Sequence, residues 1–403
     1  MIRVSGGRAG EALVGLAGAL PEPRVATVKL LKEKDDVLDR GLVLWFPAPQ
    51  SATGEDVAEL HLHGGRAVVA RVKRALAALP GLREAKPGEF TRRAFENGRI
   101  DLAEAEGLGD LLLAETESQR RMALALAGGA LSRQVAAWRD SLLQLAAMVE
   151  AALDFSDEDD VAPLPGDFAV RLAALSEEIG AWLQRPPAER LKDGVRVVVA
   201  GPPNAGKSSL FNAIVGRDAA IVSASPGTTR DLIEAPLMLG GVPIVLIDTA
   251  GLRESKDEIE AEGIARAQAA AASADLVLWL GPPAGAPDKA IRVHAKADLG
   301  LAPAESDVAI STLSGLGVDG LVRLVIQAST TLLPAEGEVA LNARQRGALR
   351  EASAALSQAL EMEDLLLVAE ALRIARTAFD HIVGATGVEA VLDTLFERFC
   401  IGK

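Results

Sequence analysis

Gly201-Pro-Pro-Asn-Ala-Gly-Lys-Ser208 matches the pattern G-x-x-x-x-G-K-S. A run of buried-strand character at 195–200 precedes it and a helix predicted at 209–215 follows, which is the context that a phosphate-binding loop requires. The glycines let backbone N–H groups surround phosphate oxygens, and the helix N-terminus adds positive potential. We expect Lys207 to reach the β- and γ-phosphates and Ser208 to ligate Mg²⁺. The other nucleotide contacts predicted here are Asn204, Ala205, Gly206 and Ser209.

Two further motifs follow in the order expected of a nucleotide switch. Asp248-Thr-Ala-Gly251 comes directly after the apolar strand at 244–247. We expect Asp248 to hold the Mg²⁺ shell through water and the Gly251 N–H to sense the γ-phosphate, with Thr249 and Ala250 nearby. Between the two motifs lies Gly227-Thr-Thr-Arg-Asp231, in which Thr229 is the candidate to ligate Mg²⁺ when the loop closes. A glycine turn before an ordinary surface helix could resemble the first motif alone, but these partners disfavour that interpretation.

The segment expected to read the base is Ala295-Lys-Ala-Asp298, where the usual pattern is Asn-Lys-x-Asp. Asp298 can accept hydrogen bonds from the guanine N1–H and 2-amino group, which adenine lacks, and the stem of Lys296 can pack over the base. Ala295 offers no amide, which should cost about 1 kcal/mol of affinity without changing specificity. Ser311 occupies the position of the last base-contacting loop.

Composition divides the remaining chain. Strands predicted at 41–46 and 57–62 and a helix at 68–78 make residues 1–100 an α+β segment. Residues 101–192 and 333–403 are rich in Ala and Leu at helical spacing and predict a helix bundle. Strands and helices alternate through 193–332, which predicts a parallel sheet with crossover helices. The fold class expected is therefore multidomain α/β and α, with an α/β domain inserted between two helical stretches; the pattern alone leaves open whether these two stretches pack together.

The length, net charge and cysteine count of the chain bear on its cellular location. The chain has 403 residues, a net charge of −14 and one cysteine, Cys400, so it cannot form an intramolecular disulfide. We find no secretory signal and no apolar run of roughly 18 residues, and we expect a cytoplasmic protein. The negative charge gives no general attraction to nucleic acid, so an RNA substrate would need a local basic patch or a partner.

At this point the sequence resembles the MnmE (TrmE) family of tRNA-modification GTPases over nearly its whole length. Its most specific matches lie outside the nucleotide motifs. They are Phe46-Pro-Ala-Pro-Gln-Ser-Ala-Thr-Gly-Glu-Asp56, His63-Gly-Gly65, Lys86-Pro-Gly-Glu-Phe90, Arg93-Ala-Phe95 and Phe399-Cys-Ile-Gly-Lys403.

The resemblance implies an N-terminal domain that binds folate and dimerises, a two-segment helical domain and an inserted GTPase domain. It implies that a homodimer acts with a flavin-dependent partner, GidA/MnmG, to modify C5 of the wobble uridine of certain tRNAs. A tetrahydrofolate derivative (5,10-methylene or 5-formyl) would supply the one-carbon unit. Family members carry a further strand and glycine-rich turn ahead of the position of Met1, and this departure is the one that bears on the folate pocket and the N-terminal dimer.

Site residues follow from the same resemblance. It implies that K⁺ supplies the charge of an arginine finger, held by Asn204, Ser223, Ser225 and Thr228. It implies that Glu260 orients the attacking water, so that Glu260, Lys207 and Thr229 are the catalytic candidates. Folate contacts would come from Arg3, Glu59, Arg99 and Lys403, with Cys400 in a redox or positioning role.

Other interpretations of these residues are less favoured by the sequence. His61 and His63 have no further Cys or His nearby and favour a structural role over a metal site. The acidic run 154–160 lacks the glycine and terminal glutamate of a calcium loop. A ribosome-assembly GTPase would share the nucleotide motifs but needs an RNA-binding domain or a basic tail, and Asp298 disfavours an ATPase.

Overall fold

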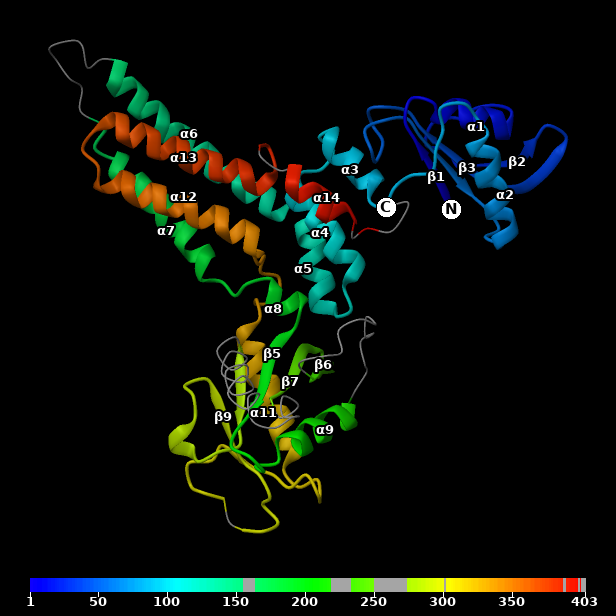
Figure 1. The fold of residues 1–403 in the computed structure, drawn as a ribbon. Helices are drawn as coiled ribbons and strands as arrows, with labels where there is room; N and C mark the ends of the chain where they lie inside the picture. The colour runs from blue at the N-terminus through cyan, green and yellow to red at the C-terminus, as the bar shows by residue number, and fades with distance from the viewer. Residues whose placement is uncertain are drawn as a thin grey trace, which may run out of the picture. The chain divides into compact units, whose positions relative to one another are not determined.

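The computed structural model describes residues 1–154, 164–218, 233–249, 274–300, 302–386, 389–397 and 399 (Figure 1). The chain forms two compact units. One comprises 1–113, 124–176 and 351–403, and the other comprises 114–123 and 177–350. The domain boundaries expected from composition stay a prediction. Among the described residues, no helix combines the length and apolar character needed to span a membrane.

The first unit begins with a four-stranded antiparallel sheet of order β1-β4-β3-β2. Its core lies between the sheet and two helices, where Leu13, Val43 and Val72 are buried together. The strand predicted at 41–46 falls within β3, and the strand predicted at 57–62 corresponds to β4, which ends one residue earlier. The elements are β1 (Ile2–Ser5), α1 (Ala9–Ala17), β2 (Thr27–Glu33), β3 (Asp36–Phe46), β4 (Val57–His61), α2 (Arg66–Ala77) and α3 (Glu89–Glu96).

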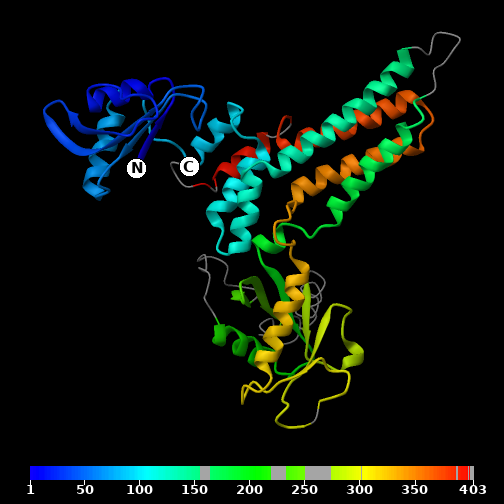
Figure 2. The ribbon, with the colours of Figure 1, turned by 180° about the vertical axis from the view of Figure 1, so that it is seen from behind.

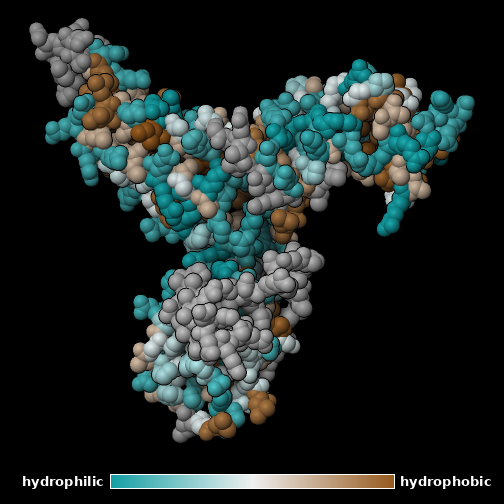
Figure 3. Space-filling model, viewed as in Figure 1, coloured by the Kyte–Doolittle hydropathy of each residue, from teal (hydrophilic) through white to brown (hydrophobic). Residues whose placement is uncertain are grey.

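Helices from both ends of the chain then pack together, as expected of a helical domain built from two segments. Helix α6 lies along α13 in both views (Figures 1 and 2). Trp138 stacks on Phe379 with ring centroids 5.8 Å apart, and Arg139 pairs with Asp380 at 3.2 Å. On the face drawn in Figure 3 hydrophilic side chains predominate over these helices, because their apolar sides face inward. The helices are α4 (Leu102–Leu113), α5 (Glu117–Ala127), α6 (Ala130–Asp154), α7 (Phe168–Gln184), α12 (Ala343–Glu361), α13 (Leu365–Val383) and α14 (Glu389–Glu397).

The second unit contains a six-stranded sheet of order β10-β9-β8-β5-β7-β6, parallel except for β6. Helices α9 and α11 contribute Leu210 and Leu321 to one core with Val197. The carboxyl ends of β5, β7, β9 and β10 therefore meet at one edge, where the nucleotide motifs follow. The elements are α8 (Glu189–Lys192), β5 (Val195–Ala200), α9 (Lys207–Asp218), β6 (Ile233–Leu239), β7 (Val242–Asp248), β8 (Leu276–Trp279), β9 (Ala290–His294), β10 (Val308–Ala309) and α11 (Val318–Leu332).

One crossover departs from the expected alternation of strands and helices. Between the parallel strands β8 and β9, the only helical element is the 3₁₀ turn Pro283–Gly285. Prolines in Gly281-Pro-Pro-Ala-Gly-Ala-Pro287 explain this, because proline removes a helix hydrogen bond and clashes with the preceding turn. The segment wraps around Trp279, whose indole donates to the Pro282 carbonyl at 2.9 Å.

Candidate functional site

The loop 201–206 joins β5 to α9, so the predicted strand–loop–helix context is present. Three of its residues have positive φ: Gly201 at 149°, Asn204 at 61° and Gly206 at 97°. Such φ angles turn the backbone tightly and are allowed mainly to glycine and asparagine. Helix α9 begins at Lys207, two positions before the predicted start, so its first N–H groups belong to the loop itself.

Lys207 lies inside this loop. It is buried, and its Nζ donates to the carbonyls of Gly201 and Pro202, both at 3.0 Å. A lysine amine within a ring of backbone groups is placed to meet phosphate oxygens. Ser208 and Ser209 follow in the first turn of α9, and both are exposed.

Asp248 lies beside this loop at the end of β7. It is paired in register with Val199 of β5 and is 2% exposed. The next residue, Thr249, is also buried, and its hydroxyl donates to the Val199 carbonyl at 2.8 Å. The Ser208 hydroxyl and the Asp248 carboxylate are oxygen ligands of the kind that Mg²⁺ takes together with phosphates, so these residues fit that ion.

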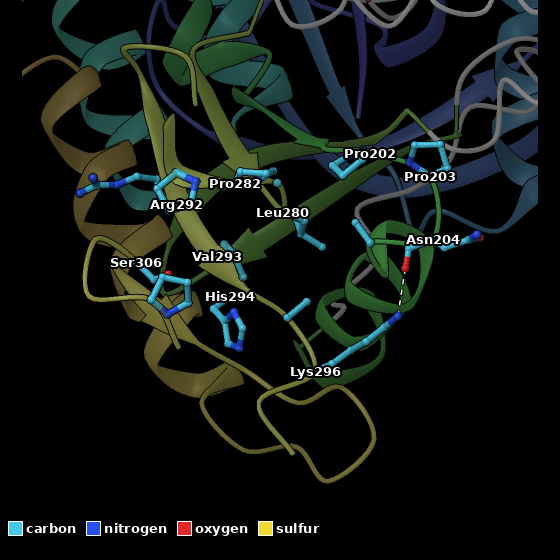
Figure 4. Close-up of a pocket in the computed structure, with 15 residues that line it drawn as sticks. Pro202, Pro203, Asn204, Leu280, Pro282, Arg292, Val293, His294, Lys296 and Ser306 are labelled. Carbon is cyan, nitrogen blue, oxygen red and sulfur yellow. Dashed lines mark hydrogen bonds between the residues drawn. The ribbon is translucent and has the colours of Figure 1, made fainter. Parts of the chain in front are cut away.

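The two base-reading segments form one structure. Lys296, with φ 60°, donates its Nζ to the Asn204 carbonyl at 3.0 Å and so ties the base-reading segment to the phosphate loop (Figure 4). A hydrogen bond from the buried Ser311 hydroxyl is the main reason that the pKa of Asp298 lies below its ordinary value. Backbone pairing of Ala297 N with Ile310 O at 2.9 Å holds the two segments in register.

A cavity of about 330 Å³ opens between the phosphate loop and the end of β9 (Figure 4). Its wall includes Pro202, Asn204, Leu280, His294 and Lys296. The Nε2 atom of His294 is buried there without a hydrogen-bond partner among the described residues. Sequence reasoning did not single out His294, because a histidine inside a strand pattern carries no motif.

A second group of candidates lies in the N-terminal sheet. Arg3 of β1 and Glu59 of β4 are directly opposite each other. The Arg3 guanidinium lies 4.8 Å from the Phe90 ring centroid, and His61 Nε2 is 3.2 Å from Glu59 Oε2. Arg99 lies against Gly54, where an added Cβ would be 3.2 Å from its Cγ.

The two histidines weighed as metal ligands each contact a carboxylate. His61 is paired with Glu59, and His63 Nδ1 lies 2.8 Å from Asp39 Oδ1. The hydrogen bond from the His63 backbone N–H is the main reason that the pKa of Asp39 lies below its ordinary value.

Several predicted residues lie outside the described part of the chain. They are Ser223, Ser225, Thr228, Thr229, Ala250, Gly251, Glu260, Cys400 and Lys403.

Comparison with known proteins covers the whole chain. The family described as the MnmE helical domain matches residues 102–400, and the family described as the GTP-binding protein TrmE N-terminus matches residues 1–99. The chain is 54% identical to the tRNA modification GTPase MnmE of Erythrobacter litoralis, covering 100% of this chain and 96% of that protein. It is 58% identical to the protein of the same name from Rhizorhabdus wittichii, and that match covers 100% of this chain and 93% of that protein.

Among solved structures, the G domain of the FeoB iron transporter of T. maritima is 26% identical over 34% of this chain and 98% of that one. The TM-score of this match is 0.25.

Proposed function

Because the chain belongs to the MnmE family of tRNA modification GTPases, we propose that it is a potassium-stimulated GTP hydrolase acting with a GidA/MnmG-type flavoprotein. Together they would modify C5 of the wobble uridine of certain tRNAs, using a tetrahydrofolate-borne one-carbon unit. The single observation that supports the nucleotide part is the shared edge of the second sheet: Lys207 comes after β5, Asp248 ends the adjacent strand β7, and Asp298 comes after β9. The lone cysteine and the tRNA substrate support a cytoplasmic location.

Hydrolysis of GTP to GDP and phosphate would proceed by positioning and charge stabilisation. Lys207 would neutralise the β- and γ-phosphate oxygens, while the N–H groups of the loop and of α9 hold the chain of phosphates in place. Ser208, Asp248 through water, and Thr229 would hold Mg²⁺, which when bound offsets the charge that develops during phosphoryl transfer. Glu260 would orient the attacking water, with the Gly251 N–H at the γ-phosphate.

Guanine recognition would rest on Asp298. Its carboxylate, ionised at neutral pH, can accept from N1–H and the 2-amino group, and the Ser311 hydroxyl, the main reason that its pKa is lowered, further favours this ionised form. The Lys296–Asn204 hydrogen bond supports this role, because it fixes the distance between the base-reading and phosphate-binding segments.

Asn204 is the described member of the proposed potassium site, whose other members are Ser223, Ser225 and Thr228. Asn204 lies, with positive φ, in the loop that would bind the phosphates, and its side-chain oxygen could ligate a cation there. A monovalent cation there would supply the positive charge that an arginine finger supplies in other GTPases.

Folate and a second copy of the chain would share the open face of the N-terminal sheet. Register places Val28, Leu42 and His61 in one row across three strands, and Leu44, Glu59 and Arg3 in the next. Val28 is 55% and Leu42 42% exposed, so an apolar row adjoins the proposed folate residues. This exposed apolar row supports the proposed homodimer, which would cover the row and form the folate pocket at the subunit interface. The donor set fits folate, since guanidinium groups suit its carboxylates and Glu59 suits its pterin N–H groups.

GTP turnover in matched KCl and NaCl buffers tests the proposal. We expect a rate about tenfold or more higher in KCl, a dependence that Asn204→Ala removes and that Asn212→Ala, on the exposed side of α9, leaves intact. Lys207→Ala should abolish turnover in both salts. Equal wild-type rates in both salts would exclude the potassium role. Addition of tRNA, the flavoprotein and folate should yield the modified wobble uridine, and an unchanged nucleoside would exclude the wider function.

A further inference from the structure

Helix α3 places an aromatic ring beneath the guanidinium of Arg3. Phe90 is 8% exposed, and its ring centroid lies 4.8 Å from Arg3 Cζ. A cation within about 6 Å of a ring centroid is attracted by the negative charge of the ring face. Because Phe90 itself is buried, it can act on a ligand only through the arginine above it.

Helix α3 is held from the sheet side, so this ring is a fixed support. Arg93 donates its Nη1 to Glu55 at 2.8 Å and to the Ser5 carbonyl at 3.4 Å, and its Nη2 to Glu89 at 2.8 Å. Ser5 lies two residues after Arg3 on the same strand and the same face. The contacts therefore fix α3 to the strand that carries Arg3.

A second set of contacts holds α3 to the C-terminal helix α14. Arg92 pairs with Asp393 at 2.8 Å. At Gly88, just before α3, an added Cβ would lie 2.3 Å from the Phe396 carbonyl oxygen, so the two backbones touch. With both sides anchored, Phe90 has little freedom to move away from Arg3.

We propose that Phe90 is a positioning residue for the folate site, because it fixes the guanidinium of Arg3, the residue paired with Glu59 across the two strands. The inference rests on the proposed use of folate by this chain. A guanidinium fixed before binding loses less conformational freedom when it meets a carboxylate, and the gain appears as affinity. Loss of the ring should weaken folate binding by about fivefold to tenfold.

Calorimetric titration of the full chain with 5-formyltetrahydrofolate tests this inference. We expect Phe90→Leu to bind about fivefold to tenfold more weakly and Phe90→Tyr, which keeps the ring, to bind like wild type. In an Arg3→Gln background Phe90→Leu should have no further effect, an outcome that a purely structural role would not give. Trp182→Leu is the matched control, since Arg185 lies 3.7 Å over that ring in the other unit; it should leave folate affinity unchanged.

GTP turnover shows whether the nucleotide-binding unit of each variant is intact. Far-UV circular dichroism shows whether each variant is folded. Should Phe90→Leu fail to fold, Phe90→Met, which is closer in volume, replaces it. Wild-type protein that binds no folate would overturn the proposed function and this inference together. Wild-type protein that binds folate while the folded Leu or Met variant binds equally well would overturn the role of Phe90 alone.

Discussion

Two non-glycine residues in left-handed conformations meet at the candidate nucleotide site. Asn204 and Lys296 have φ of 61° and 60°, and the Lys296 amine donates to the Asn204 carbonyl. A lysine in this conformation costs of order 1 kcal/mol or more, which the surrounding structure must offset. The backbone strain is thus located where the phosphate-binding and base-reading segments join. Strained backbone of this kind is expected at a ligand-binding site.

The alanine at position 295 gives a prediction at this scale. Ala295→Asn restores an amide to the base-reading segment and should tighten GDP binding by about fivefold, which corresponds to about 1 kcal/mol for one hydrogen bond. Displacement of a fluorescent GDP analogue by GDP measures the affinity of each variant. Ala297→Asn, two positions on, is the control and should bring no gain. Unchanged affinity of Ala295→Asn would show that the lost amide has no role.

Among the secondary-structure elements, the strands at the centre of the second sheet were the most predictable. β5 occupies the predicted range 195–200, and β7 contains the strand predicted at 244–247, because buried parallel strands are short apolar runs bounded by turn residues. The β8–β9 crossover is an exception to the expected alternation of strands and helices, and its prolines are a sufficient local signal for that exception. No local pattern could indicate the Ser311–Asp298 hydrogen bond or the Phe90–Arg3 contact, since each joins residues far apart in the chain.

The start of α11 depends on a glycine. Gly317 has φ 74°, and a Cβ there would lie 2.0 Å from the Ala309 carbonyl oxygen. Gly317→Ala should displace the 311–317 loop, destabilise the second unit by about 1–3 kcal/mol and weaken guanine nucleotide binding through Ser311. Gly320 lies within α11, and a Cβ added there would be 3.9 Å from the nearest atom. Gly320→Ala should therefore stabilise the second unit by up to about 1 kcal/mol. Thermal unfolding of both variants checks this; equal midpoints would refute it.

Glu89 of α3 predicts a pH dependence. Hydrogen bonds from Arg83, from the Lys86 backbone and from Arg93 lower its pKa from 4.5 to about 2. The ionised form is favoured in the folded state, so its stabilisation is present above about pH 4.5 and is lost as the pH falls towards 2. Glu89→Gln should therefore flatten the acid dependence of the first unit's unfolding.

Urea unfolding at a series of pH values below 6 measures this dependence. Glu370→Gln removes an exposed pair with Arg373 and should change the dependence less, because solvent screens it. A Glu89→Gln profile identical to that of wild type would contradict the assignment.

At the scale of the whole molecule, the two proposed ligands belong to different compact units. The nucleotide residues from Asn204 to Ser311 lie in the unit that contains 177–350, whereas Arg3, Glu59 and Arg99 lie in the other. A ligand that binds only the folded form stabilises the unit that holds it, by about 2.7 kcal/mol at a hundredfold excess over its Kd.

Scanning calorimetry should accordingly resolve two transitions. Mg·GDP should raise the midpoint of one, and 5-formyltetrahydrofolate the midpoint of the other. Asp298→Ala should remove only the first shift and Arg3→Gln only the second. A single transition raised by both ligands would indicate that the units unfold together.

The segment that carries the second sheet begins and ends at nearly one point. The Ala188 N–H, on the way in, donates to the Leu341 carbonyl, on the way out, at 3.1 Å. A segment whose two ends lie this close can be spliced into a helix-to-helix turn of a pre-existing bundle without stretching either neighbour. Such an arrangement lets a hydrolytic switch be acquired, or exchanged for another, as a single genetic cassette.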